Sequence, residues 1–280
     1  MTEKKILIAV LAALISITSA GIAQEPEELT VFTAASLTGA FGEIGQMYEN
    51  EIGISVSFNF DGSQALRTQI ENGAYADVFA SANNKQMNAL KDSGLMNNSS
   101  VIMFTNNKLS LIVPKDNPAG ISNLSDLANP GVKIVIGTKD VPVGDYTLQI
   151  IDKLANDSAY GPEYKEKFLD NIVSRETNVN YVVTKIALGE ADVGIAYVSD
   201  VTEDLASKVD KIEIPDEYNV IAEYPIGILA NSKYPVESET FIELVTSDEG
   251  KAILEKYGFM PVNATNAATA STSSLVEAAA

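Results

Sequence analysis

The sequence of 280 residues contains neither cysteine nor histidine. Without cysteine the chain has no disulfide bond, no thiolate metal site and no cysteine nucleophile. Without histidine it has no Ser-His-Asp triad, no histidine-ligated zinc ion and no histidine general base. A large share of the common enzyme mechanisms is therefore excluded before any motif is considered.

Positive charge is also scarce. The chain has 19 Lys and Arg residues against 38 Asp and Glu residues, which gives a formal net charge of −19 at pH 7. Such a surface repels nucleic acids and anionic membranes. We therefore expect no nucleic-acid partner.

Only the N-terminus has an apolar run that approaches the length of a membrane span. Lys4 and Lys5 precede the apolar run of residues 6–17, and small residues follow at 20, 21 and 23. This order is typical of a signal peptide, and the run is shorter than the ~20 residues of a spanning helix. We therefore predict a signal peptide at residues 1–23, with cleavage favoured over retention as an anchor, and an exported protein that is periplasmic or at the cell surface.

Strand-like and helix-like segments alternate along the rest of the chain. The strand-like segments are residues 29–34, 54–60, 76–80, 109–114, 132–137, 192–197 and 223–229. The helix-like segments are residues 37–50, 63–71, 86–90, 123–127, 143–154, 163–171, 179–188, 239–246 and 248–257. This alternation predicts an α/β fold with largely parallel sheets. Residues 263–280 are rich in Ala, Ser, Thr and Asn and lack aromatics, which predicts a disordered tail.

Two of the predicted strands end close to a serine at which a helix begins. Ser36 and Ser63 hold these positions, and further helices begin at Val143 and Val179. A helix N-terminus offers unpaired backbone N–H groups and a positive dipole end, so it binds an anion without a basic side chain. N-capping alone would explain either serine taken singly. The repeated arrangement, at strand ends where α/β proteins bind ligands, favours an anion site.

Several short motifs follow one another along the chain. They are the segments AASL at 34–37, GS at 62–63, ADVFASA at 76–82, VPVGDY at 141–146, NV at 178–179 and GIAY at 194–197. Together they resemble the motifs of the molybdate-binding, and by extension tungstate-binding, proteins of ABC transporters. The resemblance runs from about residue 29 to residue 262 and rests on the order and spacing of these motifs. It implies a two-lobed, type II periplasmic-binding-protein-like fold with the ligand in the interlobe cleft. Lobe 1 would comprise residues 25–106 plus 222–262, and lobe 2 residues 107–221.

The resemblance also implies a set of oxyanion ligands that consists of hydrogen-bond donors alone. The matching positions are the N–H and hydroxyl groups of Ser36 and Ser63, the N–H groups of Val143 and Val179, and the hydroxyl of Tyr197. Neutral donors allow a chain of this net charge to hold a dianion. No cofactor and no bare metal ion is expected, since Mo or W would be present only as the oxyanion.

This chain departs from the family pattern at one of these positions and at the residue that follows Ser63. Gln64 stands where many relatives have a second serine, and Val143 where many have alanine. Because the third site is thought to donate through its backbone, the valine should be tolerated. Tyr197 has a structural alternative, since a buried tyrosine at the end of a strand is common in protein cores.

The expected function is that of a monomeric extracytoplasmic solute-binding protein, not an enzyme, that delivers molybdate or tungstate to an ABC permease. Two alternatives remain open. A sulfate-type oxyanion receptor would differ mainly in the size of the cavity, which the sequence does not measure. An exported hydrolase with paired carboxylates is disfavoured because no acid pair accompanies the strand-end serines.

Overall fold

The computed structural model describes residues 28–262. The signal peptide expected at residues 1–23 and the tail expected at 263–280 lie outside the described residues. Within residues 28–262, no helix combines the length and the apolar character that crossing a membrane would require.

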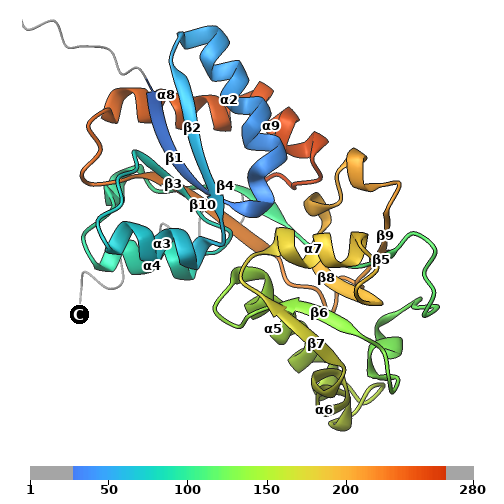
Figure 1. Ribbon diagram of the computed structural model, residues 1–280. Helices are drawn as coiled ribbons and strands as arrows, with labels where there is room; N and C mark the ends of the chain where they lie inside the picture. Colours follow the sequence, from blue (N-terminus) through green and yellow to red (C-terminus); the bar gives the residue numbers. More distant parts are fainter. Residues whose placement is uncertain (1–27, 263–280) are drawn as a thin grey trace, which may run out of the picture.

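The chain forms two five-stranded sheets, one in each of two lobes (Figure 1). Across the first sheet the strands are β2 (Ser55–Asp61), β1 (Glu28–Ala34), β3 (Val78–Ala80), β10 (Ala222–Ile228) and β4 (Ile102–Asn107). Its helices are α2 (Thr38–Ile52), α3 (Ser63–Glu71), α4 (Asn84–Asp92), α8 (Pro235–Thr246) and α9 (Asp248–Lys256).

The second lobe repeats this plan. Across its sheet the strands are β7 (Ile172–Glu176), β6 (Ile134–Gly137), β8 (Val193–Tyr197), β5 (Leu109–Pro114) and β9 (Val209–Glu213). Its helices are α5 (Pro142–Asn156), α6 (Glu163–Asp170) and α7 (Val179–Ala187). The predicted two-lobed α/β class is confirmed, and α3 and β5 have the predicted bounds.

The prediction of largely parallel sheets was wrong. Each sheet contains two parallel and two antiparallel strand pairs. The antiparallel pairs all involve β5 or β10, the strands by which the chain enters one lobe from the other. Neighbouring strands are parallel when a helical crossover connects them within one sheet. β5 and β10 each follow a strand of the other lobe, so this rule does not apply to them. Strands β4, β7 and β9 were also missed.

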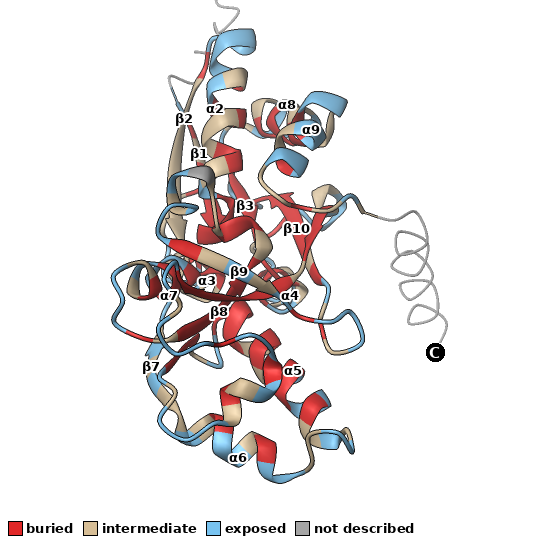
Figure 2. Cartoon of the chain, turned by 90° about the vertical axis from the view of Figure 1, so that its right-hand side faces the viewer, coloured by how far each residue is buried: buried red, intermediate tan, exposed pale blue. Residues whose placement is uncertain are grey.

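Alternate side chains of β1 pack into two different hydrophobic clusters, one of which extends into the second lobe. Val31 of β1 packs in one hydrophobic cluster with Phe41 of α2, and its neighbour Phe32 packs in another with Leu66 of α3. This follows from the two-residue period of a strand, which turns successive side chains to opposite faces. Burial is accordingly concentrated in the strands and in the helix faces that cover them (Figure 2). The ends of the strands are thereby held rigidly where they face the second lobe.

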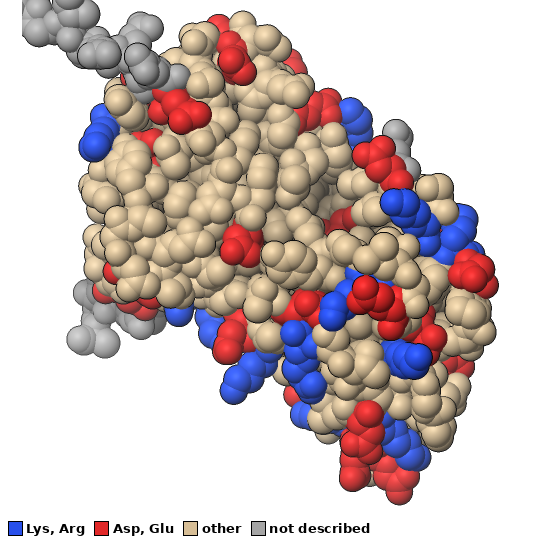
Figure 3. All heavy atoms as spheres, viewed as in Figure 1, with Lys and Arg blue, Asp and Glu red and all other residues tan. Residues whose placement is uncertain are grey.

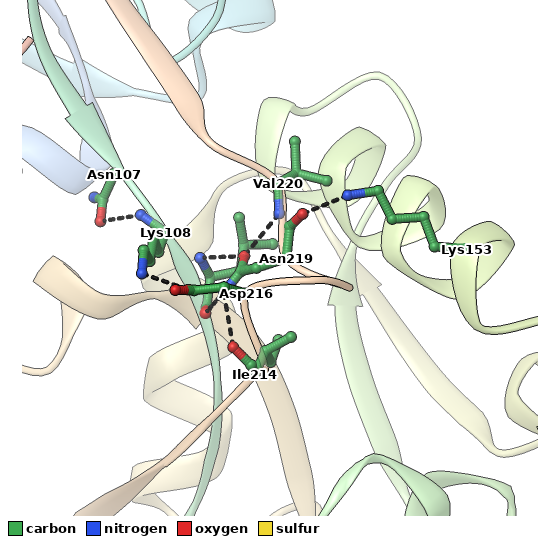
Figure 4. Close-up of polar contacts among 8 residues, drawn as sticks. Asn107, Lys108, Lys153, Ile214, Asp216, Asn219 and Val220 are labelled. Atoms are coloured by element: carbon green, nitrogen blue, oxygen red, sulfur yellow. Dashed lines mark hydrogen bonds and ion pairs between the residues drawn. The ribbon is translucent and has the colours of Figure 1, made fainter. Parts of the chain in front are cut away.

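Two chain segments connect the lobes, and one asparagine joins them (Figure 4). The chain crosses at Lys108, between β4 and β5, and returns between β9 and β10. The side chain of Asn219 accepts a hydrogen bond from the N–H of Leu109 at 3.1 Å and donates one to its carbonyl oxygen at 2.8 Å. Lys108 forms an ion pair with Asp216 at 2.5 Å. The two crossing segments are therefore fastened side by side.

Candidate functional site

All five predicted site residues line one small cavity between the lobes. The first lobe contributes Ala34, Ala35, Ser36, Gly62, Ser63 and Ala82, and the second contributes Val141, Pro142, Val143, Val179 and Tyr197. The cavity has a volume of about 10 Å³, close to the space needed for one water-sized group. Donor residues from both lobes therefore meet at a single small cavity.

Three of the predicted donors stand at the start of a helix. Ser63 is the first residue of α3, Val179 the first of α7, and Val143 the second of α5. Ser36 lies in the short 3-10 turn of Ala35–Leu37 that leads into α2. Four elements from both lobes thus direct their N-terminal N–H groups towards one region, which is favourable for a bound anion.

Neither serine acts as a helix cap. The N-cap residue of α3 is Gly62 and that of α2 is Leu37, and neither makes a side-chain cap bond. The Ser63 hydroxyl oxygen instead accepts a hydrogen bond from the N–H of Ala82 at 3.0 Å. Because the Ser63 oxygen is the acceptor in this bond, the hydroxyl proton of Ser63 can be donated to another group.

Ser36 has a partner that sequence reasoning missed. Its hydroxyl lies 2.9 Å from the hydroxyl of Tyr224 on β10, and either oxygen can donate. Tyr224 is fully buried, and its burial raises the pKa of the phenol well above the usual value. If the phenol donates to Ser36, the serine proton is available to a ligand. No sequence motif marks Tyr224, because it occupies an ordinary inward position of a strand.

Tyr197 is the donor whose geometry is most informative. Its side chain is 1% exposed, yet its hydroxyl makes no hydrogen bond of acceptable geometry with any described residue. The ring packs edge-on against Tyr224 with centroids 5.9 Å apart, and burial raises the pKa of its phenol. A buried hydroxyl group without a hydrogen-bond partner lowers the stability of the folded protein by about 1–3 kcal/mol. A ligand oxygen in the cavity would supply the missing acceptor.

The cavity lining contains no charged side chain. Arg67, one turn into α3, forms an ion pair with Glu71 at 3.5 Å. On the face drawn in Figure 3, most Lys and Arg side chains lie on the second lobe among acidic ones. Several of them are paired there, including Lys115 with Asp210 at 2.6 Å. Any attraction for an anion at the site therefore comes from N–H and O–H dipoles.

Comparison with known proteins agrees with this fold. Residues 29–260 match the model of a family described as bacterial extracellular solute-binding protein. The chain belongs to this family. The molybdate-binding protein ModA of Mycobacterium tuberculosis is 35% identical over 241 residues, which cover 86% of this chain and 87% of that protein. ModA of Escherichia coli is 28% identical over 256 residues, which cover 88% and 95%.

Solved structures of solute-binding proteins share the fold. The periplasmic molybdate-binding protein of Azotobacter vinelandii superposes with a TM-score of 0.73 at 22% identity, covering 84% of this chain and all of that one. Among residues 28–262 of the present solute-binding protein, no group of three or more acidic side chains is placed to hold a metal ion.

One acidic side chain lies close to the site of this solute-binding protein and was not anticipated from the sequence. Asp200 is 7% exposed, and its Oδ2 accepts the N–H of Tyr197 at 2.7 Å. Its Oδ1 has no hydrogen-bond partner in the described chain. Burial raises the pKa of this carboxyl to about 7. The cavity thus has a weakly acidic group directly behind one of its donors.

Replacing Ser63 with alanine should weaken anion binding and folding together. The change removes a hydroxyl donor, worth roughly 1.5–3 kcal/mol to a charged ligand. It also leaves the buried N–H of Ala82 without its acceptor, at a cost of about 1–3 kcal/mol of folding free energy. Calorimetry and urea unfolding measure the two effects separately. Unchanged affinity in the variant would remove the Ser63 hydroxyl from the site.

Proposed function

We propose that this solute-binding protein captures molybdate or tungstate outside the cytoplasm and delivers it to the permease of an ABC transporter. The observation that carries the proposal is the donor-only cavity, in which the buried Tyr197 hydroxyl has no acceptor. The 35% identity to ModA of M. tuberculosis supports the choice of ligand. The protein would act as a carrier and not as an enzyme.

Donor-only recognition favours a fully deprotonated tetrahedral oxyanion. Hydrogen bonds to a charged group contribute roughly 1.5–3 kcal/mol each. Several such bonds, less the costs of ordering and desolvation, can reach about −8 to −12 kcal/mol, or micromolar to nanomolar affinity. Phosphate species that carry a proton need a strong acceptor such as a carboxylate, and no Asp or Glu residue lines the cavity. The expected donors are Ser36, Ser63, Val143, Val179 and Tyr197.

Capture would couple to closure of the lobes. We propose lobe 1 as residues 25–106 plus 222–262 and lobe 2 as residues 107–221, with donors supplied by both. Because only the closed form makes every contact, ligand binding should shift the population towards it. The permease would then recognise the closed, monomeric protein. This role requires export, for which the signal-like segment at residues 1–23 is the expected device.

Calorimetry with molybdate, tungstate, sulfate and phosphate in parallel tests the proposal. We expect tight, metal-independent binding of molybdate and tungstate, and much weaker binding of sulfate and phosphate. Equal affinity for sulfate and molybdate would instead favour the sulfate-type receptor. Binding of none of the four anions would refute the proposed function.

A further inference from the structure

A polar side chain from each lobe meets its partner across the mouth of the cavity. Asp61, the last residue of β2, belongs to the first lobe, and Asn178 belongs to the second. The Asn178 amide nitrogen donates to the Asp61 Oδ1 at 3.0 Å. These two residues immediately precede the donor segments, since Asp61 lies two residues before Ser63 and Asn178 one residue before Val179.

The Asn178 carboxamide is held in a single orientation. Its oxygen caps α7 by accepting the N–H of Tyr181 at 3.3 Å, which leaves the amide nitrogen to face Asp61. The Asp61 Oδ1 also accepts the N–H of Gly62 at 2.7 Å, which fixes the carboxylate beside the start of α3. The bond between the lobes is therefore made by two preoriented groups.

This bond differs in kind from two other hydrogen bonds between the lobes near the cavity. Gln86 donates to the carbonyl oxygen of Asp140 and Tyr146 to that of Ala82, both at 3.4 Å. Those bonds are long and neutral. The bond from Asn178 is shorter, and its acceptor is a carboxylate. Hydrogen bonds to an ionised acceptor are roughly twice as strong as those between neutral groups.

We propose that Asp61 and Asn178 form a latch that holds the lobes closed and sets the residence time of the bound oxyanion. The inference rests on the proposed function. Both are positioning residues: neither lines the cavity, but their bond places the N–H of Val179 against the Ser63 side of the cavity. A second bond, from the Gln64 side chain to the carbonyl oxygen of Thr177 at 3.1 Å, lies beside it.

A double-mutant cycle tests the latch. Asn178→Asp alone places two carboxylates in contact and should raise the dissociation rate of molybdate at least about 10-fold. In the double variant Asp61→Asn/Asn178→Asp the amide and the carboxylate exchange places, so the bond can form again. Aspartate is also a good N-cap for α7. We therefore expect Asp61→Asn to slow dissociation about 10-fold in the Asn178→Asp background and not in the parent.

Stopped-flow tyrosine fluorescence can follow displacement of molybdate, because the chain has 11 Tyr and no Trp. Melting temperatures of the ligand-free proteins should be nearly equal, since a hydrophobic cluster that extends through both lobes stabilises the fold independently of the bond between Asp61 and Asn178. If Asp61→Asn changed the dissociation rate equally in both backgrounds, the latch would be overturned. The same holds if the variants that bind more weakly also melt at correspondingly lower temperatures.

A readout without ligand separates this inference from the proposed function. The chain has no cysteine, so cysteines introduced at the exposed Glu51 of α2 and Glu166 of α6 are unique sites for spin labels. Asn178→Asp should lengthen the distance between the labels, and the double variant should restore it. If the parent protein binds no oxyanion, the proposed function is wrong. The distances between the labels still test whether the latch exists, because they are measured without ligand. Identical distances in all four proteins would overturn the latch.

Discussion

Gly62→Ala is expected to abolish tight oxyanion binding while leaving both lobes folded. A Cβ atom at Gly62 would lie 2.5 Å from the carbonyl oxygen of Thr177, which belongs to the opposite lobe. A backbone oxygen cannot yield as a flexible side chain can. The Gly62 backbone itself, at φ −59° and ψ 133°, is acceptable for alanine. The added methyl group therefore acts as a wedge that keeps the cleft from closing.

The expected loss of affinity is large because the second lobe supplies the donors at Val143, Val179 and Tyr197. If the wedge removes these contacts at roughly 1.5–3 kcal/mol each, molybdate affinity should fall at least about 100-fold. Calorimetry gives the affinity, and small-angle X-ray scattering should show no ligand-induced compaction.

The matched control is Gly42→Ala in α2, where a Cβ atom would meet nothing within 4 Å. That variant should bind like the parent and gain up to about 1 kcal/mol of stability from helix propensity. Parent-like binding by Gly62→Ala would show that tight binding does not require the full closure seen between Gly62 and Thr177. A large loss of unfolding free energy in that variant would place the strain within the first lobe.

The sequence was most informative where local chemistry decides the structure. The serine at the end of a strand, followed by helical spacing, correctly predicted that Ser63 begins α3. Short apolar segments located β5 and β8, because every residue of both strands is buried in a packed sheet. The five candidate site residues are all near such strand ends, and the structure brings all five to one cavity. Their role as ligands remains a proposal.

What the sequence could not predict depends on contacts between distant segments. β7 and β9 are edge strands with half-exposed, charged faces, so their hydrophobic pattern is weak. Tyr224 reaches Ser36 only because β10 returns from the second lobe, a separation of 188 residues. The pairing of Asp61 with Asn178 spans 117 residues. No local motif encodes either contact, because the first depends on the return of the chain to the first sheet and the second on how the lobes meet.

The final prediction is that Asp200→Asn stabilises the protein at alkaline pH. Burial raises the pKa of Asp200 from 3.8 to about 7 in the folded state. Between these values the folded protein binds a proton that the unfolded chain has lost, so the parent becomes less stable as pH rises from about 4 to about 7. Above pH 7 the folded protein holds a buried charge whose Oδ1 has no partner.

Asparagine keeps an oxygen that can accept the N–H of Tyr197 but carries no charge to bury. We therefore expect Asp200→Asn to exceed the parent in unfolding free energy by roughly 2–4 kcal/mol at pH 8. At pH 4, where the folded Asp200 is neutral, the two should be nearly equal. Urea unfolding of both proteins at the two pH values measures this difference. An equal stability difference at pH 4 and pH 8 would mean that the pKa of Asp200 is not raised in the folded protein and that its carboxylate is hydrated.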